Sequence, residues 1–124
     1  MASTAAPKGE LLLSSLRKFY DDQENAKLLA DVLLRRRDGL SLRSLEKHVT
    51  HCGKRQSSAG KSPVYISYKA ALHGYSKKYF DAFARSAKIP FHLPTGDVVH
   101  TTPAQLNFCR WAIRTGLITR KFSE

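Results

Sequence analysis

Acidic side chains are scarce in this 124-residue chain, which has 10 Asp and Glu against 21 Lys and Arg. Six of the acids fall within residues 1–38, where seven basic residues nearly balance them. Residues 39–124 contain four acids and fourteen basic residues, a net charge of +10. A folded segment with this imbalance repels itself, and the excess is best explained if a polyanion normally lies against it.

Catalytic motifs are also missing. Glu46, Asp81 and Asp97 are the only acids between residues 39 and 121, and they do not form the paired carboxylates of metal-dependent nucleic-acid cleavage. No Gly-x-Ser-x-Gly elbow or Cys/His signature is present. Gly60-Lys61-Ser62 is no phosphate-binding loop, because Arg55 stands where that motif needs its first glycine. We expect neither an enzyme nor a cofactor.

Cysteines are few and long hydrophobic runs are absent. Cys52 and Cys109 are the only cysteines, and the apolar run 11–13 is too short for a secretory leader or a membrane span. An intracellular, reducing setting with two free thiols and no membrane contact is therefore expected. His48 and His51 lie near Cys52, but they lack the Cys pair and the histidine spacing of structural zinc sites, so no metal is expected.

The remaining composition, with 42% hydrophobic residues, predicts one α+β domain over residues 10–124. Residues 1–9 are expected to form a flexible arm, and the polar stretch 54–62 a mobile basic loop. Periodicity and turn signals predict helices at 10–20, 23–37, 42–52, 77–85 and 103–115, a strand at 64–68 and a hairpin over 88–101. The expected helix N-caps are Asp22, Ser41, Ser76 and Thr102, the last in a capping box with Gln105.

Residues 33–54 have the layout of a helix-turn-helix, in which a short Asp38-Gly39 turn precedes a helix that begins at Ser41. The apolar face of this second helix leaves an opposite face that carries Arg43, Lys47 and either Thr50 or Lys54. Such a helix suits a major groove or a row of phosphates, and an ordinary helical hairpin with a solvated basic face is the alternative. With the hairpin at 88–101 as a wing, the arrangement would be winged-helix-like. By contrast, Arg35-Arg36-Arg37 is interpreted as a complement to the dipole of the preceding helix.

Basic and aromatic residues are interleaved in the second half of the chain, a pattern typical of folded nucleic-acid binders. On the last helix, Arg110 and Arg114 with Trp111 suit phosphate contact and stacking, whereas a core tryptophan beside solvated arginines is the alternative. We expect a non-enzymatic, mainly phosphate-directed protein that binds nucleic acid, duplex DNA first and RNA second. A structural or adaptor protein that docks an acidic protein is the alternative, and the oligomeric state stays open. The candidate contact residues are Arg43, Lys47, Lys54, Arg55, Lys77, Lys78, Arg110, Trp111 and Arg114.

Several short stretches between residues 38 and 118 also match a family pattern in order. The best are Ser41-Leu42-Arg43, Tyr75-Ser76-Lys77-Lys78 and Gln105-Leu106-Asn107-Phe108. In these the chain resembles short basic proteins encoded by nucleocytoplasmic large DNA viruses, the giant viruses of algae and amoebae. The resemblance implies a viral protein in the nucleus or cytoplasmic viral factory of an infected cell, or inside the virion. It implies no particular biochemical role, although genome packaging, replication and transcription are all compatible with it.

Overall fold

The chain folds as the predicted α+β class, with a two-stranded hairpin placed before a C-terminal helix. The computed structural model describes residues 8–52 and 63–118, so the predicted loop 54–62 and most of the predicted arm lie outside it. In chain order the elements are α1 (Lys8–Phe19), α2 (Gln23–Leu33), α3 (Leu42–Lys47), the π-helical turn η1 (His48–Cys52), α4 (Pro63–Tyr75), α5 (Lys77–Phe80), β1 (Ile89–His92), β2 (Val98–Thr101) and α6 (Pro103–Arg114). The antiparallel hairpin pairs Ile89 with Thr101 and His92 with Val98.

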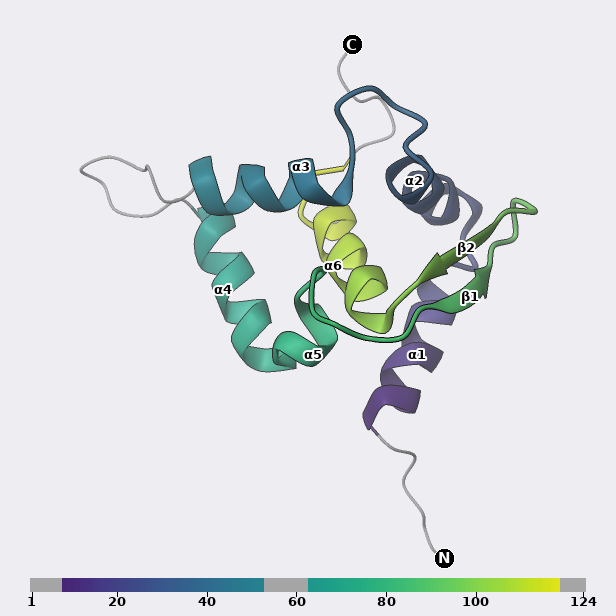
Figure 1. Cartoon of the computed structure of the whole chain (residues 1–124), viewed down its shortest axis with the longest axis horizontal. Helices are drawn as coiled ribbons and strands as arrows, with labels where there is room; N and C mark the ends of the chain where they lie inside the picture. Colours follow the sequence, from purple (N-terminus) through teal and green to yellow (C-terminus); the bar gives the residue numbers. More distant parts are fainter. Residues whose placement is uncertain (1–7, 53–62, 119–124) are drawn as a thin grey trace, which may run out of the picture.

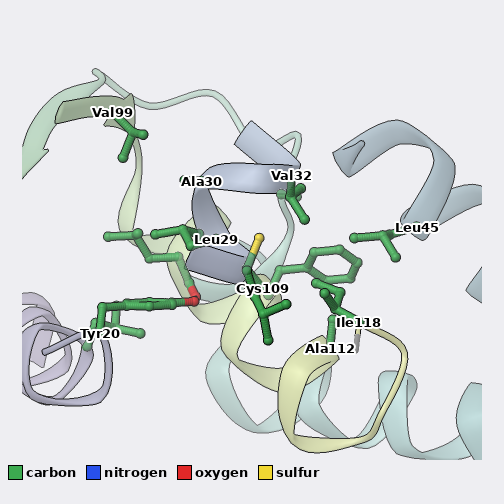
Figure 2. Packing of buried hydrophobic residues seen from close by; sticks show 14 of the residues in the cluster. Tyr20, Leu29, Ala30, Val32, Leu45, Val99, Cys109, Ala112 and Ile118 are labelled. Atoms are coloured by element: carbon green, nitrogen blue, oxygen red, sulfur yellow. The ribbon is translucent and has the colours of Figure 1, made fainter. Parts of the chain in front are cut away.

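Helix α6 lies at the centre of the molecule. Figure 1 shows α4 and α5 on one side of it, α3 across one end, and α1, α2 and the hairpin on the other side. Seven of its twelve residues are buried. Side chains from several elements meet around the buried thiol of Cys109, among them Tyr20, Leu29, Val32, Leu45 and Ile118 (Figure 2). The core is therefore built around the last helix of the described chain, and the other helices cover it.

The predicted caps hold at three of four helix starts. Asp22 Oδ1 accepts from the backbone N–H of Glu24 at 2.8 Å, and Ser41 and Ser44 form a reciprocal capping box. Thr102 Oγ1 accepts from the N–H of Gln105 at 3.1 Å, but the box is not completed, because Gln105 Oε1 accepts from the hydroxyl of Thr101 at 2.8 Å and not from the N–H of Thr102. The pairing of small polar caps with free N–H groups is local, which is why sequence alone locates it.

The segment after residue 63 corrects the predicted strand, because Pro63–Tyr75 is the helix α4. Pro63 takes the first helical position, where its missing N–H costs nothing. Tyr65 and Tyr68 are buried and Leu72 is half-buried, a spacing of three and four that makes one helical face. Tyr68 lies 5.8 Å from the rings of both Phe80 and Trp111. This aromatic packing outweighs the β preference of the local sequence.

Helix α5 is also shorter than predicted, because it ends at Phe80 and not at residue 85. Asp81 is extended, and its Oδ1 accepts from the N–H of Phe83 at 2.9 Å, which turns the chain away from the helix. Ser76 has φ +79° and makes no side-chain cap. Phe83, which lies within the predicted helix 77–85, is outside α5 and 49% exposed.

Helix α2 ends four residues before the predicted position, at Leu33. Arg35 has φ +54°, a left-handed conformation that cannot continue the helix. Arg36 and Arg37 therefore do not lie in the last turn of α2. They form ion pairs, Arg36 Nη2 with Asp97 Oδ1 at 2.8 Å and Arg37 Nε with the buried Asp31 at 2.9 Å. The helix-dipole interpretation of the triple arginine is replaced by these two pairs.

Candidate nucleic-acid interface

Five exposed basic side chains lie on α3, α4 and α5. No carboxylate of the described chain pairs with them. We call this set the cationic flank: Arg43, Lys47, Lys69, Lys77 and Lys78. Glu46 is the only acid on these three helices. Since α4 contacts both η1 and α5, the three helices form a continuous side of the molecule, seen beside α6 in Figure 1.

The opposite side of the molecule is electrically balanced. Residues 8–33, which hold α1 and α2, contain four basic and five acidic residues. The connection after α2 adds Arg36 and Arg37, which are paired with acids, and the exposed Arg35 and Asp38. Of the nine basic residues that the structure describes between 39 and 118, five lie on α3, α4 and α5, and the exposed Arg85 and Lys88 lie between α5 and β1.

Arg43 and Lys47 lie where the sequence places them. Leu45 and Val49 of α3 and η1 are 5% and 1% exposed, whereas Arg43 and Lys47 point to solvent. The helix-turn-helix spacing differs, because eight residues, 34–41, separate α2 from α3, and a helix-turn-helix has a turn of three or four. The hairpin packs near α1 through the rings of Tyr20 and Phe91, 6.0 Å apart, and Figure 1 shows it on the far side of α6 from α4.

The predicted Arg/Trp platform of the last helix does not lie on the surface. Arg110 is 4% exposed, and its guanidinium donates to Ser15 Oγ at 2.7 Å and to Asn107 Oδ1 at 3.0 Å. Trp111 is half-buried, and its indole N–H donates to Ser67 Oγ at 3.0 Å. The alternative interpretation, a core tryptophan beside two solvated arginines, agrees better with the structure. Of the two arginines, however, only Arg114 is solvated. Periodicity on α6 failed here because the helix is surrounded, so its polar residues are buried with its apolar ones.

Arg114 is exposed, but it lies away from the flank. Its guanidinium lies 5.1 Å from the ring centroid of Phe19 on α1. Lys54 and Arg55 fall outside the described residues, in the stretch of sequence that joins η1 to α4. Of the nine predicted contacts, Arg43 and Lys47 are exposed on α3 and Lys77 and Lys78 on α5, with α4 between the two helices.

Lys69 was not among the predicted contacts, although it belongs to the flank. The predicted strand at 64–68 ended just before it. The spacing of Tyr65, Tyr68 and Leu72 would have revealed a helix with Lys69 on its outer face. Burial, and after it the charges of Glu46 and Asp81, raises the pKa of Tyr68 to about 12, so this core tyrosine stays neutral beneath the flank.

Among residues 8–52 and 63–118, no three His, Cys, Asp or Glu side chains lie close enough to hold a metal ion. In the same part of the chain, no helix has the length and apolar character needed to cross a membrane.

The structure thus describes a small α+β fold with five exposed cations on α3, α4 and α5 that form no ion pair within the described chain. The chain belongs to DUF7197, a family of unknown function, whose model matches residues 4–122. An uncharacterised protein of Acanthamoeba polyphaga mimivirus is 29% identical over 126 residues, which cover 90% of this chain and 49% of that protein. The chain thus spans about half the length of this curated relative. No solved structure matches it significantly. The relative supports the viral origin that the sequence resemblance implied.

Proposed function

We propose that this protein binds duplex DNA through the cationic flank, by contacts directed mainly at phosphates and without enzymatic activity. The observation that carries the proposal is the flank itself, with five exposed Lys and Arg side chains on three adjoining helices and none in an ion pair within the described chain. Exposed cations of this kind can neutralise the phosphates of a DNA backbone, and the DNA then releases the counterions that had been condensed on it. Lys54, Arg55 and Lys61 add three further cations to the sequence between η1 and α4.

A duplex fits the flank better than a single strand does. Proteins that bind single strands combine cations with aromatic side chains on which bases stack. Trp111, the expected stacking residue, lies in a ring cluster, 5.8 Å from Phe108 and from Phe80. The flank therefore offers charge with little stacking surface, which favours contact with the backbone of double-stranded DNA. A protein of this kind would act in the nucleus or viral factory of the infected cell, or on the packaged genome.

The test is a titration of mixed-sequence duplex at several NaCl concentrations. If each of the five flank cations neutralises one phosphate, the logarithm of the binding constant should fall with the logarithm of the NaCl concentration with a slope of about −4.5. The double variant Arg43→Ala/Lys47→Ala should bind all sequences more weakly and lose about 2 from the magnitude of that slope. The matched control is Arg17→Ala/Lys18→Ala, which removes the same charge from exposed positions on α1 and should leave the slope unchanged.

A flat salt dependence, or equal effects of the two double variants, would contradict the proposal. Pull-down from infected cells with and without nuclease separates it from the adaptor hypothesis. Partners bridged by DNA disappear after nuclease treatment, whereas an acidic protein bound directly to the flank remains.

A further inference from the structure

An apolar groove with a buried cation in its floor lies on another part of the molecule, between α1 and α5. It has a volume of about 300 Å³ and is lined by Leu11, Leu12, Ser15, Tyr75, Tyr79 and Arg110. Two of its walls face solvent, since Leu11 is 57% and Tyr75 37% exposed. None of these residues belongs to the cationic flank, but the groove borders it, because the ammonium of Lys78 lies 5.6 Å from the ring centroid of Tyr79.

The guanidinium of Arg110 is held rigidly at this groove. Nη1 donates to Ser15 Oγ on α1 and Nη2 donates to Asn107 Oδ1, and the amide of Asn107 in turn donates to the carbonyl of Tyr79 at 2.9 Å. Hydrogen bonds to Ser15 on α1 and to Asn107 on α6, whose amide is itself held by α5, thus fix the planar fork before any ligand arrives. Preorganisation of this kind lowers the entropy lost on binding.

The charge of Arg110 has no counter-ion in the described chain. Its hydrogen-bond partners are neutral, and no ion pair within residues 8–52 and 63–118 includes it. Burial, and then the nearby Arg114, lowers the pKa of Arg110, yet a guanidinium titrates so far above neutral pH that it stays charged. A buried charge without an opposite charge is costly, and a ligand that supplies one gains a strong bidentate pair.

We propose that this groove binds an apolar protein segment that carries a carboxylate, with the carboxylate paired to Arg110 and the apolar side chains against Leu11, Leu12 and Tyr75. The guanidinium fork matches a carboxylate, and the leucine and tyrosine walls match the aliphatic or aromatic neighbours of that carboxylate. A nucleic-acid backbone fits poorly, because it brings closely spaced charges and no apolar group to these walls. The carboxylate is that of an Asp or Glu side chain inside the segment, because leucines of α1 and tyrosines of α4 and α5 line the groove and an internal residue brings a neighbour to each wall.

The experiment uses four short synthetic peptides and the full-length protein, followed by NMR. One leucine-rich peptide ends in a free carboxylate and is compared with its amidated form. A second, amidated peptide has glutamate between leucines and is compared with its glutamine form. A carboxylate peptide should shift the Arg110 Nε–H and the Leu11 methyl resonances and bind about tenfold or more tightly than its neutral partner. A difference confined to the pair with the free terminal carboxylate would contradict the assignment to an internal side chain.

Variants locate the binding. Arg110→Gln should abolish the preference for the carboxylate, but it removes hydrogen bonds from the interior and is checked by circular dichroism. Leu11→Glu tests the site without changing the interior, because it places a negative charge on the exposed wall of the groove. This variant should bind the carboxylate peptides about tenfold more weakly. Ser14→Glu adds the same charge to an exposed position of α1 that does not line the groove, and should leave binding unchanged.

Three results would overturn the proposal: no binding by any peptide, equal binding of acid and neutral forms, or equal affinities of Leu11→Glu and Ser14→Glu. Saturation of Arg110 by inorganic phosphate in preference to the peptides would also overturn it. Arg43→Ala/Lys47→Ala should bind the peptides normally, so failure of the groove and failure of the DNA interface are distinguishable.

Discussion

At the scale of single residues, the buried polar groups are individually satisfied. Among the described residues, every buried side-chain nitrogen and oxygen has a hydrogen-bond partner. The hydroxyl of Tyr20, 1% exposed, donates to the carbonyl of Leu106 at 2.8 Å, and burial raises its pKa well above the ordinary value. Arg110 differs from these groups because it has hydrogen-bond partners but no oppositely charged partner within the described chain.

The surface pair between Arg36 and Asp97 predicts a dependence of stability on pH. Hydrogen bonds from Arg36 and then from Thr95 lower the pKa of Asp97. A carboxyl group whose pKa is lower in the folded state stabilises the fold fully at pH values above its unfolded-state pKa, which is about 4. This contribution to stability is lost as the pH falls through the folded-state pKa. The difference in unfolding free energy between wild type and Asp97→Asn should therefore be largest near pH 7 and shrink below about pH 4. Urea denaturation across this range measures it, with Asp21→Asn as the control; a difference that grows in acid would contradict it.

We expect the buried thiol of Cys109 to react only after the protein unfolds. Burial raises its pKa to about 12, and its side chain is fully enclosed. Since the thiolate is the reactive form, Ellman's reagent at pH 8 should label Cys109 only in denaturant. The measurement uses the Cys52→Ser background so that Cys109 is the one thiol present. Rapid labelling of the native protein would show that the core around α6 opens readily.

At the scale of elements, α4 is the clearest case in which packing decides the structure. Its sequence begins with residues that favour strands, and the helix forms because Tyr65 and Tyr68 bury on one face. Partners for that face come from α5 and α6, which lie later in the chain. A strand at the same place would need a neighbouring strand, and the two described strands pair with each other.

Ile66 distinguishes a helix from a strand at this position. It is 57% exposed on the outer face of α4. In a helix, Ile66→Ala should be neutral or stabilising by a few tenths of a kcal/mol, because alanine has the higher helix propensity. In a strand the same change should destabilise, because β-branched residues favour strands. Thermal unfolding of the two proteins decides, and a clear loss of stability would argue against the helix.

Similar substitutions at the N-caps of α6 and α5 should have different effects on the free energy of unfolding. Thr102→Ala should cost about 1 kcal/mol, because it removes the acceptor for the N–H of Gln105. Ser76→Ala should change stability by less than about 0.5 kcal/mol, since Ser76 is exposed and its side chain caps nothing. Chemical denaturation measures both, and equal costs would contradict the assignment of these caps.

At the scale of the whole molecule, the proposed function predicts that duplex DNA stabilises the fold. Repulsion among the five flank cations falls when phosphates neutralise them. At a free duplex concentration of about 100 times Kd, the unfolding free energy should rise by about 2.7 kcal/mol. The rise in Tm should vanish in 1 M NaCl and be smaller for Arg43→Ala/Lys47→Ala than for Arg17→Ala/Lys18→Ala. An unchanged Tm at low salt would contradict DNA binding by the folded protein.

The sequence by itself determined the features that depend on neighbours along the chain. These are the fold class, the caps Asp22, Ser41 and Thr102, the hairpin over 88–101, the exposure of Arg43 and Lys47, and the unequal charge of the two halves. Each follows from spacing, backbone hydrogen bonding or a simple count, and none needs a distant partner.

The tertiary structure alone decided the rest. It placed α6 at the centre, so that Arg110 was buried and its predicted surface role was lost. It made α4 a helix and thereby added Lys69 to the flank, and it paired Arg36 and Arg37 with acids. These outcomes depend on contacts between residues far apart in sequence, and amphipathic periodicity cannot identify the polar residues of a helix that is enclosed on nearly all sides.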